Sequence, residues 1–143
     1  MKSIALFVLI SLAFSGIVHS DEARAIERLT KIIEALDQIG DELVGEPVSG
    51  TLVQGDTASM ELTLSSEYMY HVHIWSDSYF NIMEFWLTDS RGEVHSIADG
   101  DNASLAAYPD TSGTWTLNIL LHEGAWSDSA SYAAALFRGR RYI

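Results

Sequence analysis

Residues 68–89 read YMYHVHIWSDSYFNIMEFWLTD, two strand-like runs on either side of the polar break Ser76-Asp77-Ser78. Every second side chain in each run is apolar, at positions Tyr70, Val72, Ile74, Met83, Phe85 and Leu87. Such period-two alternation is typical of strands that bury one face and expose the other. We therefore expect Val72, Ile74, Phe85 and Leu87 in a core, and His71, His73 and Glu84 on outer faces. If the two runs form a hairpin, His73 would lie opposite Glu84 and His71 opposite Trp86.

The chain after Pro47 continues this pattern. Short alternating runs are separated by Gly, Asp, Asn and Ser, which favour turns. The candidate strands are 50–54, 58–65, 68–76, 81–89, 93–98, 103–108, 113–122 and 130–138. Several short strands at regular spacing indicate an all-β fold, and we predict an antiparallel, jelly-roll-like β-sandwich of about eight strands. Its core should also contain Trp115, Leu117 and Ile119.

One amphipathic α-helix is predicted before the sandwich, over residues 22–43. Apolar residues recur there at three- and four-residue steps, at Ala25, Ile26, Leu29, Ile32, Ile33, Leu36, Ile39 and Leu43. This spacing places them on one stripe, wide enough for a helix that lies on a core. Gly40 or Gly45 can end the helix, and Pro47 prevents its continuation. The predicted organisation is a helical segment over 21–45 and a sandwich domain over 46–143.

The first twenty residues, MKSIALFVLISLAFSGIVHS, have the order of a secretory signal peptide. A basic start at Lys2 precedes an apolar run, and Val18 and Ser20 suit the −3 and −1 positions of a cleavage site. The apolar run is too short for a stable membrane span, which needs about 20 residues. The chain contains no cysteine, which excludes a lipoprotein anchor and a disulfide framework. We expect a bacterial protein that is periplasmic or secreted.

The charge is strongly acidic, with 20 Asp and Glu against eight Lys and Arg and a formal net charge of −12. A field of this sign repels nucleic acid and anionic lipid, so neither is an expected partner. A soluble acidic surface explains the imbalance without any partner.

Five short segments of residues 48–138 carry a resemblance to a known family. They are Gly50-Thr51-Leu52 with Gly55-Asp56, Met60 to Leu64, Phe85 to Asp89 with Gly92, Ser112-Gly113-Thr114-Trp115, and Tyr132-Ala133-Ala134. Together they resemble the bacterial pre-peptidase C-terminal domain, a β-sandwich appended to secreted proteases and other exported enzymes. The resemblance implies a non-catalytic accessory domain. The family's acidic positions before the central hairpin are replaced by Phe80-Asn81-Ile82-Met83, so no calcium site is carried over.

A metal site is the sharpest chemical hypothesis. His71 and His73 project to the same side of a strand, and Glu84 would join them only if the two runs form a hairpin in the stated register. The alternative is a solvated strand face that carries two imidazoles. Coordination needs three or four converging ligands, so we expect no tightly bound transition metal and no cofactor. Asp99-Gly100-Asp101-Asn102 offers oxygens for calcium, but it lacks the ligand spacing of an EF-hand loop, and an Asx turn is the preferred interpretation.

Trp75 and Trp86 are the other candidate ligand-binding residues, together with His71 and His73. Indoles on the polar side of their strands could stack on a sugar or a peptide side chain. Alternatively, one or both cover a sheet edge or lie beneath the helix.

Catalysis finds little support, because neither G-x-S-x-G nor HExxH occurs in the chain. The predicted function is therefore a non-catalytic binding module of the cell envelope with a protein or carbohydrate partner. The alternatives are a metal-binding protein that uses His71 and His73, and a structural protein that self-associates through its helix.

Overall fold

The computed structural model describes residues 20–38, 40–77, 82–122 and 128–140. The predicted signal peptide lies almost entirely outside this part of the chain, so it stays a prediction. The elements are α2 (Ser20–Gln38), β1 (Glu42–Val53), β2 (Thr57–Leu64), β3 (Tyr68–Ser76), β4 (Met83–Thr88), β5 (Val94–Gly100), β6 (Asn102–Ala107), β7 (Gly113–Leu121) and β8 (Ser129–Arg140).

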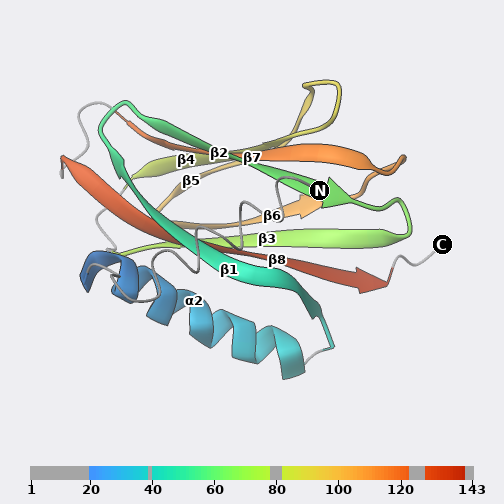
Figure 1. The fold of residues 1–143 in the computed structure, drawn as a ribbon, viewed down its shortest axis with the longest axis horizontal. Helices are drawn as coiled ribbons and strands as arrows, with labels where there is room; N and C mark the ends of the chain where they lie inside the picture. The colour runs from blue at the N-terminus through green and yellow to red at the C-terminus, as the bar shows by residue number, and fades with distance from the viewer. Residues whose placement is uncertain (1–19, 39, 78–81, 123–127, 141–143) are drawn as a thin grey trace.

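The strands form two four-stranded sheets that pack face to face (Figure 1). The strand order is β1-β8-β3-β6 in the first sheet and β2-β7-β4-β5 in the second. Every neighbouring pair is antiparallel. Two four-stranded sheets that pack face to face with these strand orders make a jelly roll, so the predicted β-sandwich is confirmed.

Strands β3 and β4 do not form the hairpin on which the three-residue metal hypothesis depended. β3 pairs with β6 and β8, whereas β4 pairs with β5 and β7 in the other sheet. At the end of β3, Ser76 N–H donates to the carbonyl of Asp101 and Asp77 N–H donates to the carbonyl of Ser131. The polar break therefore carries the chain from one sheet to the other and does not reverse it within a sheet.

The core between the sheets contains the residues that the alternation predicts. All seven expected side chains have an exposed fraction of 4% or less: Val72, Ile74, Phe85, Leu87, Trp115, Leu117 and Ile119. They belong to one continuous apolar cluster that includes residues of all strands except β5, whose Ala98 packs against it. The inward faces of β3, β4 and β7 were therefore predicted correctly from the sequence, without knowledge of how these strands pair.

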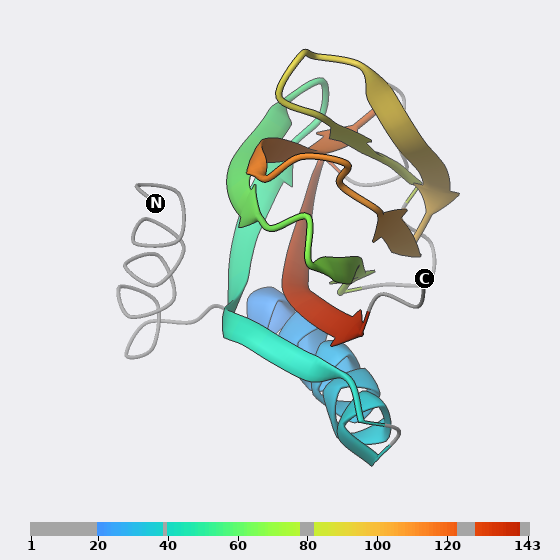
Figure 2. The same ribbon diagram turned by 90° about the vertical axis from the view of Figure 1, so that its right-hand side faces the viewer.

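Helix α2 lies on the outer face of the first sheet, against β8, β1 and β3 (Figure 2). Ala25 and Leu29 are fully buried against Ala133, Ala135 and Phe137 of β8. Small side chains on β8 let the helix approach the sheet closely. The apolar stripe is therefore used within the chain, and this packing gives no support to self-association through the stripe.

The helix ends earlier than expected, at Gln38. Gly40 has a positive φ of 93°, its N–H donates to the carbonyl of Asp37, and Asp41 N–H donates to the carbonyl of Leu36. These are the two bonds of a Schellman motif. The chain then enters β1 at Glu42. A bulge between Val44 and Val48 of this strand accommodates Gly45 and Pro47. Bulges on edge strands accommodate both residue types, which is why the predicted strand began too late, at residue 50.

No helix in the described ranges is long and apolar enough to cross a membrane.

Candidate functional site

The outer face of the first sheet carries His71, His73 and Trp75. Their partners across the sheet on β8 are Phe137, Ala135 and Ala133 in that order. Trp75 packs against the cluster that joins α2 to β8. This indole therefore lies beneath the helix, as one of the two sequence interpretations expected.

Arg28 of α2 fixes the helix over Trp75. Its guanidinium carbon lies 4.7 Å from the centre of the indole ring, a cation–π contact. Nη1 donates to the carbonyl of Ser76 at 2.7 Å, and Nη2 donates to Oδ2 of Asp101 at 2.5 Å. Asp101 of the predicted oxygen-rich loop is therefore occupied by a structural ion pair. Sequence reasoning missed Arg28, because its partners lie 48 and 73 residues away.

His73 is half-buried, and its ring meets the Phe137 ring edge-on with centroids 5.5 Å apart. Burial lowers the pKa of His73 from its ordinary value of 6.5, the nearby His71 lowers it further, and the Asp41 carboxylate opposes both effects. Between that lowered pKa and 6.5, the unfolded chain binds a proton that the folded chain does not. The free energy of unfolding should therefore fall as the pH is lowered through this window.

His73→Gln should flatten this pH dependence, because glutamine cannot take up the proton. We expect the variant to lose less stability than the wild type between pH 7.5 and pH 5 in urea denaturation. His122→Gln removes an exposed imidazole directly after β7 of the other sheet, so it serves as the comparison variant for surface histidines. Equal flattening in both variants would assign the effect to surface histidines in general.

The predicted metal ligands do not converge. His71 and His73 lie on the outer face of the first sheet, with ring centroids 6.3 Å apart. Glu84 lies on β4, on the outer face of the second sheet, with the core between them. The three-residue site depended on the incorrect hairpin.

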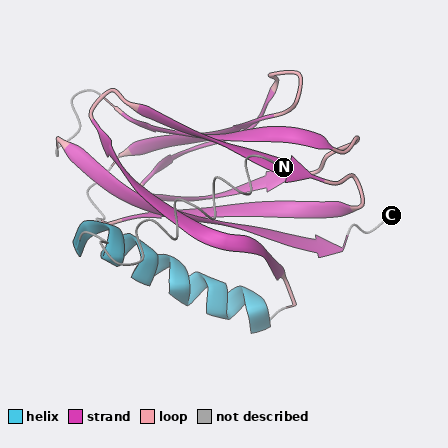
Figure 3. Cartoon of the chain, in the orientation of Figure 1, coloured by secondary structure: helices cyan, strands magenta, loops and turns pink. Residues whose placement is uncertain are grey.

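The outer face of the second sheet, which we call the open face, has no helix over it in the described part of the chain (Figure 3). Its central row consists of Ile97, Trp86, Asn118 and Ser59, which are neighbours across β5, β4, β7 and β2. Ile97 is 64% exposed, and Trp86 is partly exposed. Asn118 accepts a hydrogen bond from the Ser59 hydroxyl at 2.8 Å, which helps to fix the row.

A second row of the open face places Asp99, Glu84 and Leu120 side by side on β5, β4 and β7. His122 Nε2 lies 3.3 Å from Oε2 of Glu84. A shallow hollow of about 330 Å³ is lined by Glu84, Ile97, Ala98, Asp99 and His122. Of the five predicted site residues, Trp86 and Glu84 lie on this open face, and Glu84 lines the hollow. The alternation of side chains along β5 around Ile97 was the sequence signal that could have indicated this surface.

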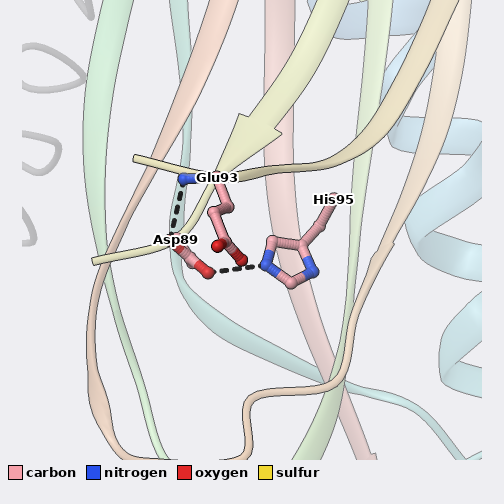
Figure 4. Close-up of side chains that lie close together, drawn as sticks. All are labelled: Asp89, Glu93 and His95. Atoms are coloured by element: carbon pink, nitrogen blue, oxygen red, sulfur yellow. Dashed lines mark hydrogen bonds and ion pairs between the residues drawn. The ribbon is translucent and has the colours of Figure 1, made fainter. Parts of the chain in front are cut away.

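A compact polar cluster lies at one end of the sandwich, in the β4–β5 turn (Figure 4). Oδ1 of Asp89 accepts hydrogen bonds from the N–H groups of Arg91 and Glu93, and Oδ2 lies 2.7 Å from Nε2 of His95. The bond to His95 is the main cause that lowers the pKa of Asp89, although partial burial opposes it. The His95 ring packs on Trp115, with centroids 4.6 Å apart. The sequence analysis did not single out this cluster.

Oxygen and nitrogen atoms of Asp89, Glu93 and His95 lie within 4.8 Å of one another, a spacing that could hold a metal ion. However, the Asp89 carboxylate already has three protein partners, which together close the turn. The cavity beside it measures only about 30 Å³, the volume of about one water molecule. The geometry is therefore explained by the structure of the turn.

The described residues form a jelly-roll β-sandwich in which helix α2 covers the outer face of the first sheet and no described helix covers the second. No protein-family model and no curated protein sequence matches the chain. Among solved structures, it is similar to the Aeromonas hydrophila periplasmic inhibitor of g-type lysozyme, PliG. The TM-score is 0.52 and the identity 13%, over 71% of this chain and 90% of that one. The corresponding Salmonella Typhimurium inhibitor has a TM-score of 0.43 and 12% identity, over 66% and 86% of the two chains. At such identities the likeness shows the fold alone.

Proposed function

We propose that this protein is a non-catalytic, exported binding module that uses its open face to bind a positively charged protein. One observation carries the proposal: the open face combines exposed apolar side chains with carboxylates, and its four described strands supply no Lys or Arg. Strands β2, β4, β5 and β7 contain Glu61, Glu84 and Asp99 but neither Lys nor Arg. Within the described residues, Lys and Arg lie on α2 and β8, with Arg91 in the β4–β5 turn.

The apolar part of the open face has the composition of a protein interface. Trp86 and Ile97 are direct cross-strand neighbours, and Leu120 lies in the adjacent row. Aromatic residues are enriched at the centres of interfaces, where they supply most of the binding energy. The surrounding carboxylates and the net charge of −12 would attract a basic partner and speed its association.

The similarity to a periplasmic lysozyme inhibitor supports a g-type lysozyme as the first partner to test. That choice also agrees with the predicted export of the chain. The resemblance to pre-peptidase C-terminal domains stays a prediction, and it too favours an accessory role without catalysis.

Binding to purified g-type lysozyme tests the proposal, measured by calorimetry and by the rate of cell-wall lysis. We expect inhibition that weakens at high salt, because exposed charges are screened. Trp86→Ala and Ile97→Asp should each weaken binding about thirtyfold or more, the range of central interface residues.

Val53→Asp is the matched control, because Val53 is a 52% exposed aliphatic residue on β1 of the other sheet. Its affinity should equal that of the wild type. Binding that Val53→Asp weakens as much as Ile97→Asp would exclude the open face as the interface. No binding to a g-type lysozyme at low salt would exclude this class of partner.

A further inference from the structure

The hollow on the open face has one acidic wall and one apolar wall. Glu84 on β4 and Asp99 on β5 are directly opposite each other in the sheet. Directly opposite residues of an antiparallel pair point to the same side, with Cβ atoms about 4.5–5.5 Å apart. Ile97 lies two residues before Asp99, on the same side of β5, and its side chain is 64% exposed. The hollow has a volume of about 330 Å³ and is open to solvent, so a long side chain can enter it.

The strands around Glu84 and Asp99 supply no permanent positive charge. Like charges directly opposite each other destabilise a sheet. His122 Nε2 lies 3.3 Å from Oε2 of Glu84, and an imidazole contributes a positive charge only when it is protonated. None of the four strands of this sheet supplies a Lys or Arg to the pair. A cation from a partner could therefore approach both carboxylates without displacing a Lys or Arg of these strands.

We propose that this hollow is the subsite for one arginine side chain of the protein partner. This inference rests on the proposed function, because it assumes that a basic protein docks on the open face. The aliphatic stem of the arginine would lie on Ile97, and its guanidinium would donate hydrogen bonds to Glu84 and Asp99. Trp86, the direct neighbour of Ile97, borders the same contact.

A guanidinium fits the hollow better than a metal ion does. Atoms of three metal-ligating side chains come within 4.8 Å of one another only at Asp89, Glu93 and His95 among the described residues, and not around Glu84. A metal ion needs ligand atoms that converge in this way, whereas the planar guanidinium presents five N–H donors that are spread over a larger area. A lysine ammonium is a smaller point charge and would bridge the two carboxylates less well.

The test uses a small probe, so it does not depend on identifying the partner. The intact protein is titrated with N-acetyl-arginine methylamide, and backbone amide shifts are followed by NMR. The neutral citrulline analogue has nearly the same shape without the charge. We expect saturable shifts centred on Glu84, Ile97 and Asp99 with the arginine probe, and none there with citrulline.

Glu84→Gln and Asp99→Asn should each weaken binding of the arginine probe about three- to fivefold, the range that exposed charge pairs contribute. Glu61→Gln removes a carboxylate from the same face outside the hollow, and it should leave the affinity unchanged. A lysine probe that binds as tightly as the arginine probe would overturn the assignment to arginine. Shifts spread equally around Glu61 would overturn the subsite itself.

The two proposals fail separately. Lysozyme binding that Ile97→Asp abolishes, combined with no response to the arginine probe, would retain the open face and reject the subsite. Arginine-probe binding at the hollow without lysozyme binding would retain the subsite and reject that class of partner.

Discussion

Leu117→Ala should lower the free energy of unfolding by about 2–5 kcal/mol, the range for removing a buried leucine side chain. Leu117 lies at the centre of β7 and is fully buried. On its own sheet its neighbours are Met60 of β2 and Leu87 of β4, which also point into the core. β7 itself is held by ladders on both sides, to β2 and to β4, so the cavity can collapse only partly. Much of the expected loss in the free energy of unfolding should therefore be measured by equilibrium urea denaturation.

Thr114→Ala on the same strand is the matched control. Thr114 is exposed, and surface changes of this kind usually alter stability by less than about 0.5 kcal/mol. The ratio of the stability losses of Leu117→Ala and Thr114→Ala directly measures the difference between an inward and an outward position of β7. A loss below about 0.5 kcal/mol at Leu117 as well would mean that the side chain is not part of a packed core.

The inner face of each sheet was predictable because burial is encoded locally. In β3, β4 and β7, each second residue is apolar, and this signal survives whatever the strand pairs with. Pairing is not encoded in the same way. The short break after Ser76 has the polarity of a hairpin turn, but the chain there crosses to the other sheet. That choice depends on the competition between all eight strands, which no local pattern contains.

The same limit of local patterns explains why the sequence could not distinguish the two tryptophans. Trp75 and Trp86 have equivalent positions on their strands, and alternation alone places both on outer faces. The structure separates them because α2 covers the first sheet, whereas no helix of the described residues covers the second. The amphipathic stripe showed that the helix must dock, but it could not show which sheet receives it. The small residues Ala133 and Ala135 on β8 were the available signal.

Leu29→Asp should destabilise the protein at least as much as the change in the core. Leu29 is fully buried between α2 and the first sheet, against Ala133, Ala135 and Phe137. The variant loses a buried leucine, which costs about 2–5 kcal/mol. It also places a carboxylate in an apolar contact with no partner, so either the charge is desolvated or the helix leaves the sheet. Urea denaturation monitored by far-UV circular dichroism measures the loss.

Ala35→Asp adds the same charge to the exposed side of the same helix, and it should change stability by less than about 0.5 kcal/mol. The two variants also test whether the docked helix prevents association of the protein. If α2 leaves the sheet in Leu29→Asp, the apolar surface around Phe137 becomes exposed, and such patches promote association. Sedimentation should then show larger species for Leu29→Asp and not for Ala35→Asp. Equal stability and equal mass of the two variants would mean that the stripe of α2 does not depend on β8 for its burial.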